Sequence, residues 1–107
     1  MTVSENFKEY VLDQLSHLDG LSARRMFGGV AIYQYGTIFA LISDDVVYLK
    51  VDETTVNKYI EEGSKAFKPF PNRAVIKSYY ELPMNVLENS DKFVEWAKES
   101  VEVQKRN

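Results

Sequence analysis

The sequence predicts one α+β domain of two layers, a mainly antiparallel sheet with helices packed on one face. Three observations lead to this fold class. Apolar residues repeat with a helical period at both ends of the chain, and the middle is rich in Val, Ile, Tyr and Phe. The connections between the predicted strands are shorter than the dozen or so residues that a parallel crossover needs. Helices and sheet would then bury their apolar faces against each other.

A helix is predicted at the start of the chain. Its apolar residues recur at spacings of three or four and share one face: Phe7, Tyr10, Val11, Leu15 and Leu18. Thr2 with Glu5 fits a capping box, and Ser4 is an alternative N-cap. Gly20 is a stop signal a little beyond the last turn.

Three strands are predicted next, over residues 30–35, 37–43 and 46–51. Gly36 offers the positive φ that the first tight turn needs, and Asp44-Asp45 forms the second turn. Turns this short join neighbouring strands, so the three strands form an antiparallel meander.

The second half of the chain begins with a short helix that Asp52 caps and Gly63 ends. The buried stripe of this helix is predicted to be Val56, Tyr59 and Ile60. Residues 66–68 and 74–82 are strand-like, and Pro83 ends the second of these segments. A final helix starts at Ser90, which gives the order α-β-β-β-α-β-β-α.

Composition limits the class of protein. A chain of 107 residues has the usual length of one domain, so residues 1–107 are expected to form one core. There is no cysteine, which excludes disulfides, thiolate nucleophiles and Cys-ligated zinc. Neither a signal peptide nor an apolar run of ~18 residues is encoded, so we expect a cytoplasmic protein without membrane contact. A net charge of −3 disfavours direct binding of nucleic acid.

The densest unusual segment combines two arginines, an apolar pair and two glycines: Arg24, Arg25, Met26, Phe27, Gly28 and Gly29. It suggests a strand end or edge followed by a turn, with the arginines on opposite faces. In a structural interpretation, one arginine is solvated, the other forms an ion pair, and the glycines permit a bend. In a functional interpretation, an arginine offers its planar guanidinium to a carboxylate or phosphate, and the glycines let another backbone approach.

Tyrosines form the second candidate feature. Tyr79 and Tyr80 are adjacent on one predicted strand, so one of them must face away from the core. Tyr33, Tyr35 and Tyr48 are candidates for an exposed sheet face. Such a face would suit a protein interface, where Tyr and Arg are enriched, although packing with the hydroxyl at the surface explains the same pattern.

No pattern of catalytic residues is recognisable. His17 is the only imidazole, and a nucleophilic triad needs such a base beside its nucleophile. Its position near the end of the first helix is typical of a surface or capping residue rather than a metal ligand. We therefore expect neither enzymatic activity nor a cofactor or metal.

The ordered set of motifs resembles the N-terminal domain of the TfoX/Sxy regulators. The likeness runs over roughly residues 4–100 and rests on residues 24–30, 32–33, 36, 39–42, 48–52, 79–83 and 96–97. The resemblance implies a two-layer α+β fold of the secretion-chaperone-like type. It also implies a link to transcriptional regulation of natural competence, in which family members act with the cyclic-AMP receptor protein. Full-length regulators carry a second, helical domain, so this chain is expected to be a stand-alone copy. The family supplies no established catalytic residues.

The expected function is thus a non-enzymatic regulatory module that binds a protein. The partner would belong to the transcription machinery or be the cyclic-AMP receptor protein. A small-molecule-binding domain and a direct nucleic-acid binder are the alternatives. An exposed sheet edge beside Gly28 and Gly29 would also permit a homodimer.

Overall fold

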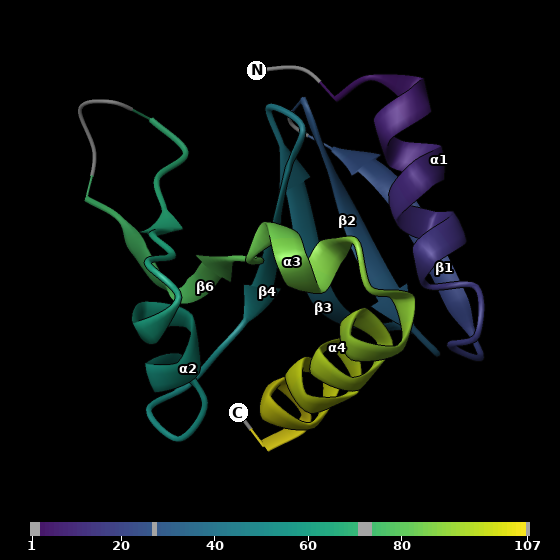
Figure 1. The fold of residues 1–107 in the computed structure, drawn as a ribbon. Coiled ribbons are helices and arrows are strands. Elements are labelled where there is room, and N and C mark those ends of the chain that lie inside the picture. The colour runs from purple at the N-terminus through teal and green to yellow at the C-terminus, as the bar shows by residue number, and fades with distance from the viewer. Residues whose placement is uncertain (1–2, 27, 71–73, 107) are drawn as a thin grey trace.

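The computed structural model describes residues 3–26, 28–70 and 74–106 of the chain (Figure 1). The fold is α+β, an open antiparallel sheet with helices packed on it, and the helix and strand order agrees with the sequence prediction. The elements in chain order are α1 (Glu5–Gln14), β1 (Leu21–Met26), β2 (Gly29–Gln34), β3 (Thr37–Ser43), β4 (Val46–Lys50), α2 (Val56–Glu61), β5 (Ala66–Phe67), β6 (Ile76–Glu81), α3 (Met84–Leu87) and α4 (Ser90–Arg106).

The sheet runs in the order β1-β2-β3-β4-β6-β5, and every neighbouring pair is antiparallel. The predicted meander of three strands is one strand longer, because Leu21–Met26 adds β1 at the edge. This strand has apolar residues only at its ends and at Ala23, so its pattern is weak in the sequence. The pair Arg24-Arg25 lies on this edge strand, just before the turn into β2.

All the described helices pack on one face of the sheet, which we call the inner face (Figure 1). Helix α4 lies across β3 and β4, and α1 and α3 extend the same layer. The core contains Val11 from α1, Leu15 just after it, and Phe93 and Ala97 from α4, packed against the apolar residues of the strands. A bulge between Ile32 and Tyr33 shifts the register, and both Phe39 and Ala40 opposite it are fully buried.

Helix α1 begins as predicted but ends earlier. Ser4 is the N-cap, and its hydroxyl accepts a hydrogen bond from the Phe7 amide at 3.1 Å. The alternative cap at Thr2 lies outside the described residues. The helix stops at Gln14, yet Leu15 and Leu18 remain buried through the turns that follow. Gly20, at φ +73°, leads the chain into β1.

Helix α2 differs from its prediction in two residues. Tyr59 is fully buried, but Ile60 is 52% exposed, so the prediction that Ile60 belongs to the buried stripe is wrong. Six residues make under two turns, and successive residues point about 100° apart, so only one side of this short helix reaches the core. Asp52 caps the preceding turn instead of the helix, because its Oδ1 accepts from the Thr54 amide at 2.9 Å and from the Thr54 hydroxyl.

Among the residues that the structure describes, no helix has the length and apolar character needed to cross a membrane.

Candidate interaction face

The opposite face of the sheet, which we call the outer face, carries no helix from the described parts of the chain. Cross-strand pairs place one continuous row of side chains there: Arg24, Ala31, Leu41, Tyr48 and Glu81. Since partners in neighbouring strands share a face, this row runs from the edge strand β1 to β6. Tyr33 pairs with Ile38, and Lys50 with Tyr79, on the same side of the sheet.

Aromatic side chains cover the half of the outer face formed by β4, β5 and β6. The rings of Tyr48 and Phe67 are 4.6 Å apart between centroids, and the Lys50 ammonium lies 5.4 Å from the centre of the Tyr79 ring. Burial raises the pKa of Tyr79 to about 12, and interaction with Tyr33 adds to the shift. Burial also raises the pKa of Tyr48, followed by the effects of the Glu81 and Asp44 carboxylates.

The adjacent tyrosines divide between the two faces, as the alternation predicts. Tyr79 faces outward but is only 9% exposed because its neighbours surround it. Tyr80 faces the inner side, where its ring lies 6.4 Å from that of Tyr59. Tyr79 is therefore part of the outer face and Tyr80 part of the packing around the core.

An apolar groove of about 480 Å³ lies on the outer face. Its walls are Met26 of β1, Leu41 of β3, Phe67 of β5, and Pro69 and Phe70 of the segment that follows. Leu41 and Met26 are half-buried, and Phe70 is 54% exposed. We refer to this feature as the outer groove.

Two glycines of the motif have structural explanations. Gly28 lies in the β1–β2 turn at φ +79°, a conformation that other residues rarely adopt. A Cβ atom on Gly29 would lie 2.7 Å from the Ile42 carbonyl oxygen, so only glycine allows β2 to approach β3 this closely. The backbone of Gly29 also lines the outer groove. Phe27 itself lies outside the described residues.

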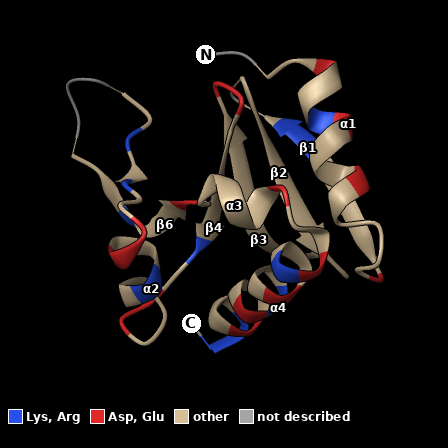
Figure 2. Ribbon diagram, viewed as in Figure 1, with Lys and Arg blue, Asp and Glu red and all other residues tan. Residues whose placement is uncertain are grey.

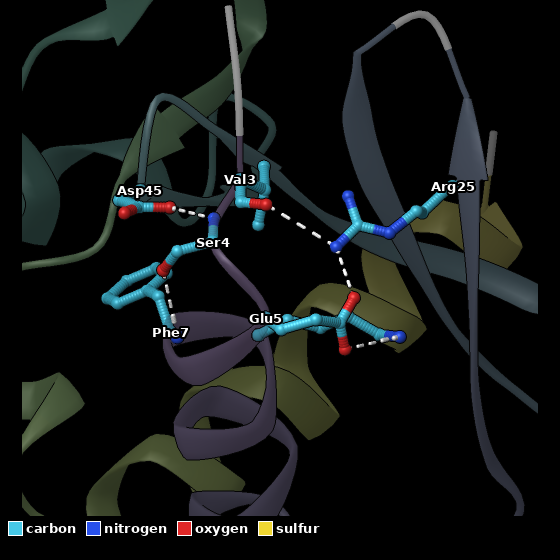
Figure 3. A network of polar contacts seen from close by, with 7 residues as sticks. Val3, Ser4, Glu5, Phe7, Arg25 and Asp45 are labelled. Carbon is cyan, nitrogen blue, oxygen red and sulfur yellow. Dashed lines mark hydrogen bonds and ion pairs between the residues drawn. The ribbon is translucent and has the colours of Figure 1, made fainter.

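Arg25 faces the inner side and joins the start of α1 to the sheet (Figure 3). Its guanidinium donates to the Val3 carbonyl at 3.3 Å and forms an ion pair with Glu5. This hydrogen bond, with a smaller contribution from Lys8, holds the pKa of Glu5 below its usual range. In the same network the Ser4 amide donates to Asp45 at 2.9 Å. Arg25 is thus the ion-paired arginine of the structural interpretation.

Arg24 faces the outer side and is exposed. Within the described residues it makes no hydrogen bond or ion pair. Met26, a wall of the outer groove, stands two positions further along the same face of β1. The structure thus brings Arg24 and Met26 to the outer face and separates them from Arg25 and Tyr80.

A second hollow of about 530 Å³ lies between α2 and the ends of β4 and β6. It is wide and mixes apolar side chains with Lys50, Lys77 and Asp52. Asp52 is already bound to Thr54 and to Arg106, whose guanidinium is 3.0 Å away. This hollow is less uniform in chemistry than the outer groove.

Sequence reasoning missed the wall of the groove made by Leu41, Phe67, Pro69 and Phe70. The run of Phe and Pro residues at 67–71 was a usable signal, because a loop with two phenylalanines must cover or present apolar surface. His17, by contrast, is exposed after α1, and the described residues contain no cluster of His, Asp or Glu that could hold a metal ion.

The sequence model of a protein family, the TfoX N-terminal domain, matches residues 13–104 of this chain. The match includes the whole sheet, the outer groove and nearly all of α4. A search of curated proteins gives no match.

Proposed function

Because the chain belongs to the TfoX N-terminal domain family, we propose that it is a non-enzymatic regulatory module that binds a protein through its outer face. The observation that carries this proposal is the outer groove, an apolar hollow on a sheet face over which no described helix packs. The proposed setting is transcriptional regulation in the cytoplasm, including the competence pathway that the family resemblance implies.

The chemistry of the outer groove supports a protein ligand. Interfaces are anchored by a few large side chains that enter well-packed pockets and lose their water there. Leu41, Phe67 and Phe70 offer apolar walls to such an anchor, and the tyrosines beside them combine apolar rings with polar hydroxyls. A two-layer fold leaves this face available because its core is complete on the inner face.

The proposal is tested by a matched pair of methionine variants. Met26→Glu places a carboxylate in the wall of the outer groove, whereas Met84→Glu places one on α3, where Met84 is 64% exposed. We expect the wild type and Met84→Glu to capture the same discrete protein from native lysate, and Met26→Glu to lose it. Circular dichroism would establish that both variants are folded. Equal capture by all three proteins would contradict the proposed site.

The identity of the partner has its own test. We propose that it belongs to the transcription machinery, with the cyclic-AMP receptor protein as the first candidate because the family resemblance implies it. Titration of the purified receptor with the domain, by calorimetry, would show binding that Met26→Glu abolishes. Binding that is the same for Met26→Glu and the wild type would contradict this pairing.

The size of the outer groove favours a second candidate function. A volume of about 480 Å³ lies within the range of ~300–1,000 Å³ typical of small-molecule sites, and the walls are apolar. An apolar metabolite would then raise the melting temperature of the wild type but not of Met26→Glu. The absence of any such shift across a panel of apolar metabolites would argue against this function.

A further inference from the structure

We infer that the outer face recognises an extended peptide segment in which an acidic side chain stands next to a large apolar one. In this arrangement Arg24 binds the carboxylate and the outer groove takes the apolar side chain. The inference rests on the proposed function and deepens it, because it names the chemistry of the partner.

The spacing between Arg24 and the outer groove supports this pairing. Arg24 and Met26 point to the same side of β1 and stand about 7 Å apart along the strand, since each residue advances a strand by about 3.3 Å. Side chains two positions apart in an extended peptide have the same spacing. An acidic and an apolar residue separated by one position would therefore meet Arg24 and the groove together.

Arg24 has the properties of a binding residue that its neighbour lacks. Its side chain is exposed and makes no ion pair or hydrogen bond within the described residues, whereas Arg25 is held by Val3 and Glu5. A guanidinium presents several donors in one plane and binds carboxylates through two parallel hydrogen bonds. Binding a carboxylate would thus break no existing contact of the described residues.

Charge on the outer face is complementary to an acidic segment. The strands place Arg24, Lys50 and Lys77 on this face with one carboxylate on the same strands, Glu81. Asp44 lies in the adjoining β3–β4 turn, and Asp52 shares the second hollow with Lys50 and Lys77. The chain as a whole has a net charge of −3, and α1 carries three acidic residues against one lysine, whereas acidic and basic residues alternate along α4 (Figure 2). The strands of the outer face therefore carry a net positive charge, opposite in sign to the net charge of the chain, which favours an acidic partner.

A peptide fits these observations better than a nucleic acid does. Single-stranded nucleic acids need free ring faces on which bases stack. Here the rings of Tyr48 and Phe67 cover each other, and the Lys50 ammonium lies over the Tyr79 ring. The outer groove also requires an apolar side chain, which a peptide supplies.

Selection from a library of random peptides tests the inference. The library is panned on four folded proteins: the wild type, Arg24→Glu, the groove variant Met26→Glu, and Lys98→Glu as a matched charge reversal. Lys98 is exposed on α4, on the inner side, and is in no ion pair within the described residues. We expect the wild type and Lys98→Glu to enrich peptides with Asp or Glu two positions from a large apolar residue. Arg24→Glu should bind those peptides about tenfold more weakly and select Lys or Arg in place of the acidic residue.

The outcomes separate this inference from the proposed function. The inference would be overturned if the enriched peptides need Met26 but show no preference for an acidic residue. It would also be overturned if Arg24→Glu selects the same peptides as the wild type. Either result would leave a protein-binding groove. If the wild type enriches no peptide, or only peptides that Met26→Glu binds as well, both the inference and the proposed site are contradicted. Displacement of the selected peptides by a single-stranded oligonucleotide at low salt would also overturn the inference, in favour of nucleic acid.

Discussion

At the scale of single residues, the motif around Arg24 and Arg25 separates into two tasks. The side chains of the two arginines lie on opposite faces of the edge strand, so one holds α1 against the sheet while the other is free to meet a ligand. Gly29 keeps β2 close to β3 because its missing side chain leaves room for the Ile42 carbonyl. The motif thus combines packing with a candidate binding residue.

The close approach at Gly29 gives a stability prediction. Gly29→Ala is expected to lower the free energy of unfolding by about 1–3 kcal/mol, because its Cβ would lie 2.7 Å from a backbone oxygen that cannot easily move. Gly36→Ala is the comparison. A Cβ atom at position 36 meets nothing within 4 Å, so any loss of stability in this variant comes only from the backbone conformation at φ +82°. Urea denaturation measures both. A Gly29→Ala variant as stable as the wild type would show that β2 and β3 can separate without cost.

Asp52 gives a prediction about pH. Hydrogen bonds from the Thr54 side chain, then the interaction with Arg106, lower the pKa of Asp52 to about 2. The lowered pKa stabilises the folded state at pH values above ~4, the pKa of an aspartate in the unfolded chain. This stabilisation is lost as the pH falls toward the pKa of Asp52 in the folded state. Unfolding free energies should therefore decline between about pH 4 and pH 2, with a shallower decline in Asp52→Asn. Glu95→Gln, an exposed α4 substitution, is the control and should keep the wild-type slope.

At the scale of elements, α2 is joined to α4 by three side-chain contacts. The Tyr59 ring lies 4.9 Å from Trp96, Lys58 lies 4.2 Å above the same Trp96 ring, and Lys58 pairs with Glu99 at 2.8 Å. Burial raises the pKa of Tyr59, whose hydroxyl has no hydrogen-bond partner within the described residues although Ser100 is near. The ring therefore contributes the packing, and the hydroxyl adds a cost of burial.

This division predicts two opposite results at Tyr59. Tyr59→Phe removes an unpaired buried hydroxyl and should leave stability unchanged or raise it by up to about 1 kcal/mol. Tyr59→Ala removes the ring and should cost about 3–5 kcal/mol. Thermal and urea unfolding measure both variants. A loss of more than about 1 kcal/mol in Tyr59→Phe would mean that the hydroxyl has a partner, such as a bound water.

The elements also show what the sequence could predict. The strands at residues 30–51 follow from β-rich composition and short turns, and the helical period of Phe93, Ala97 and Val101 predicts α4. Exposure of Ile60 could not be predicted, because it depends on which side of a six-residue helix meets the core. The outer groove was equally hidden, since Met26, Leu41 and Phe67 come together only when β1, β3 and β5 take their places in the fold.

At the scale of the whole molecule, the two layers divide the chemistry. The inner face holds the core and the helices, while the outer face holds tyrosines, three cations on its strands and the outer groove. The fold is therefore complete without anything on the outer face, and a ligand can bind there without disturbing the core.

The edge strand β1 gives a prediction about self-association. Antiparallel pairing of β1 with a second copy would bring together Arg24 and Arg25 of both chains, and like charges oppose such pairing. Any homodimer formed through this edge should therefore strengthen as salt screens the arginines. Analytical ultracentrifugation at low and high salt measures the dissociation constant of the dimer. A dimer that weakens with salt would place the contact elsewhere.

The most direct test of the central claim is photo-crosslinking in living cells from single positions on the two faces. A photoreactive residue at position 26 lies in the outer groove, and one at position 84 lies on α3. Binding of a protein at the outer face predicts a discrete protein adduct from position 26 and none of the same mass from position 84. The same adduct from both positions, or adducts from position 84 alone, would contradict binding of a protein at the outer face.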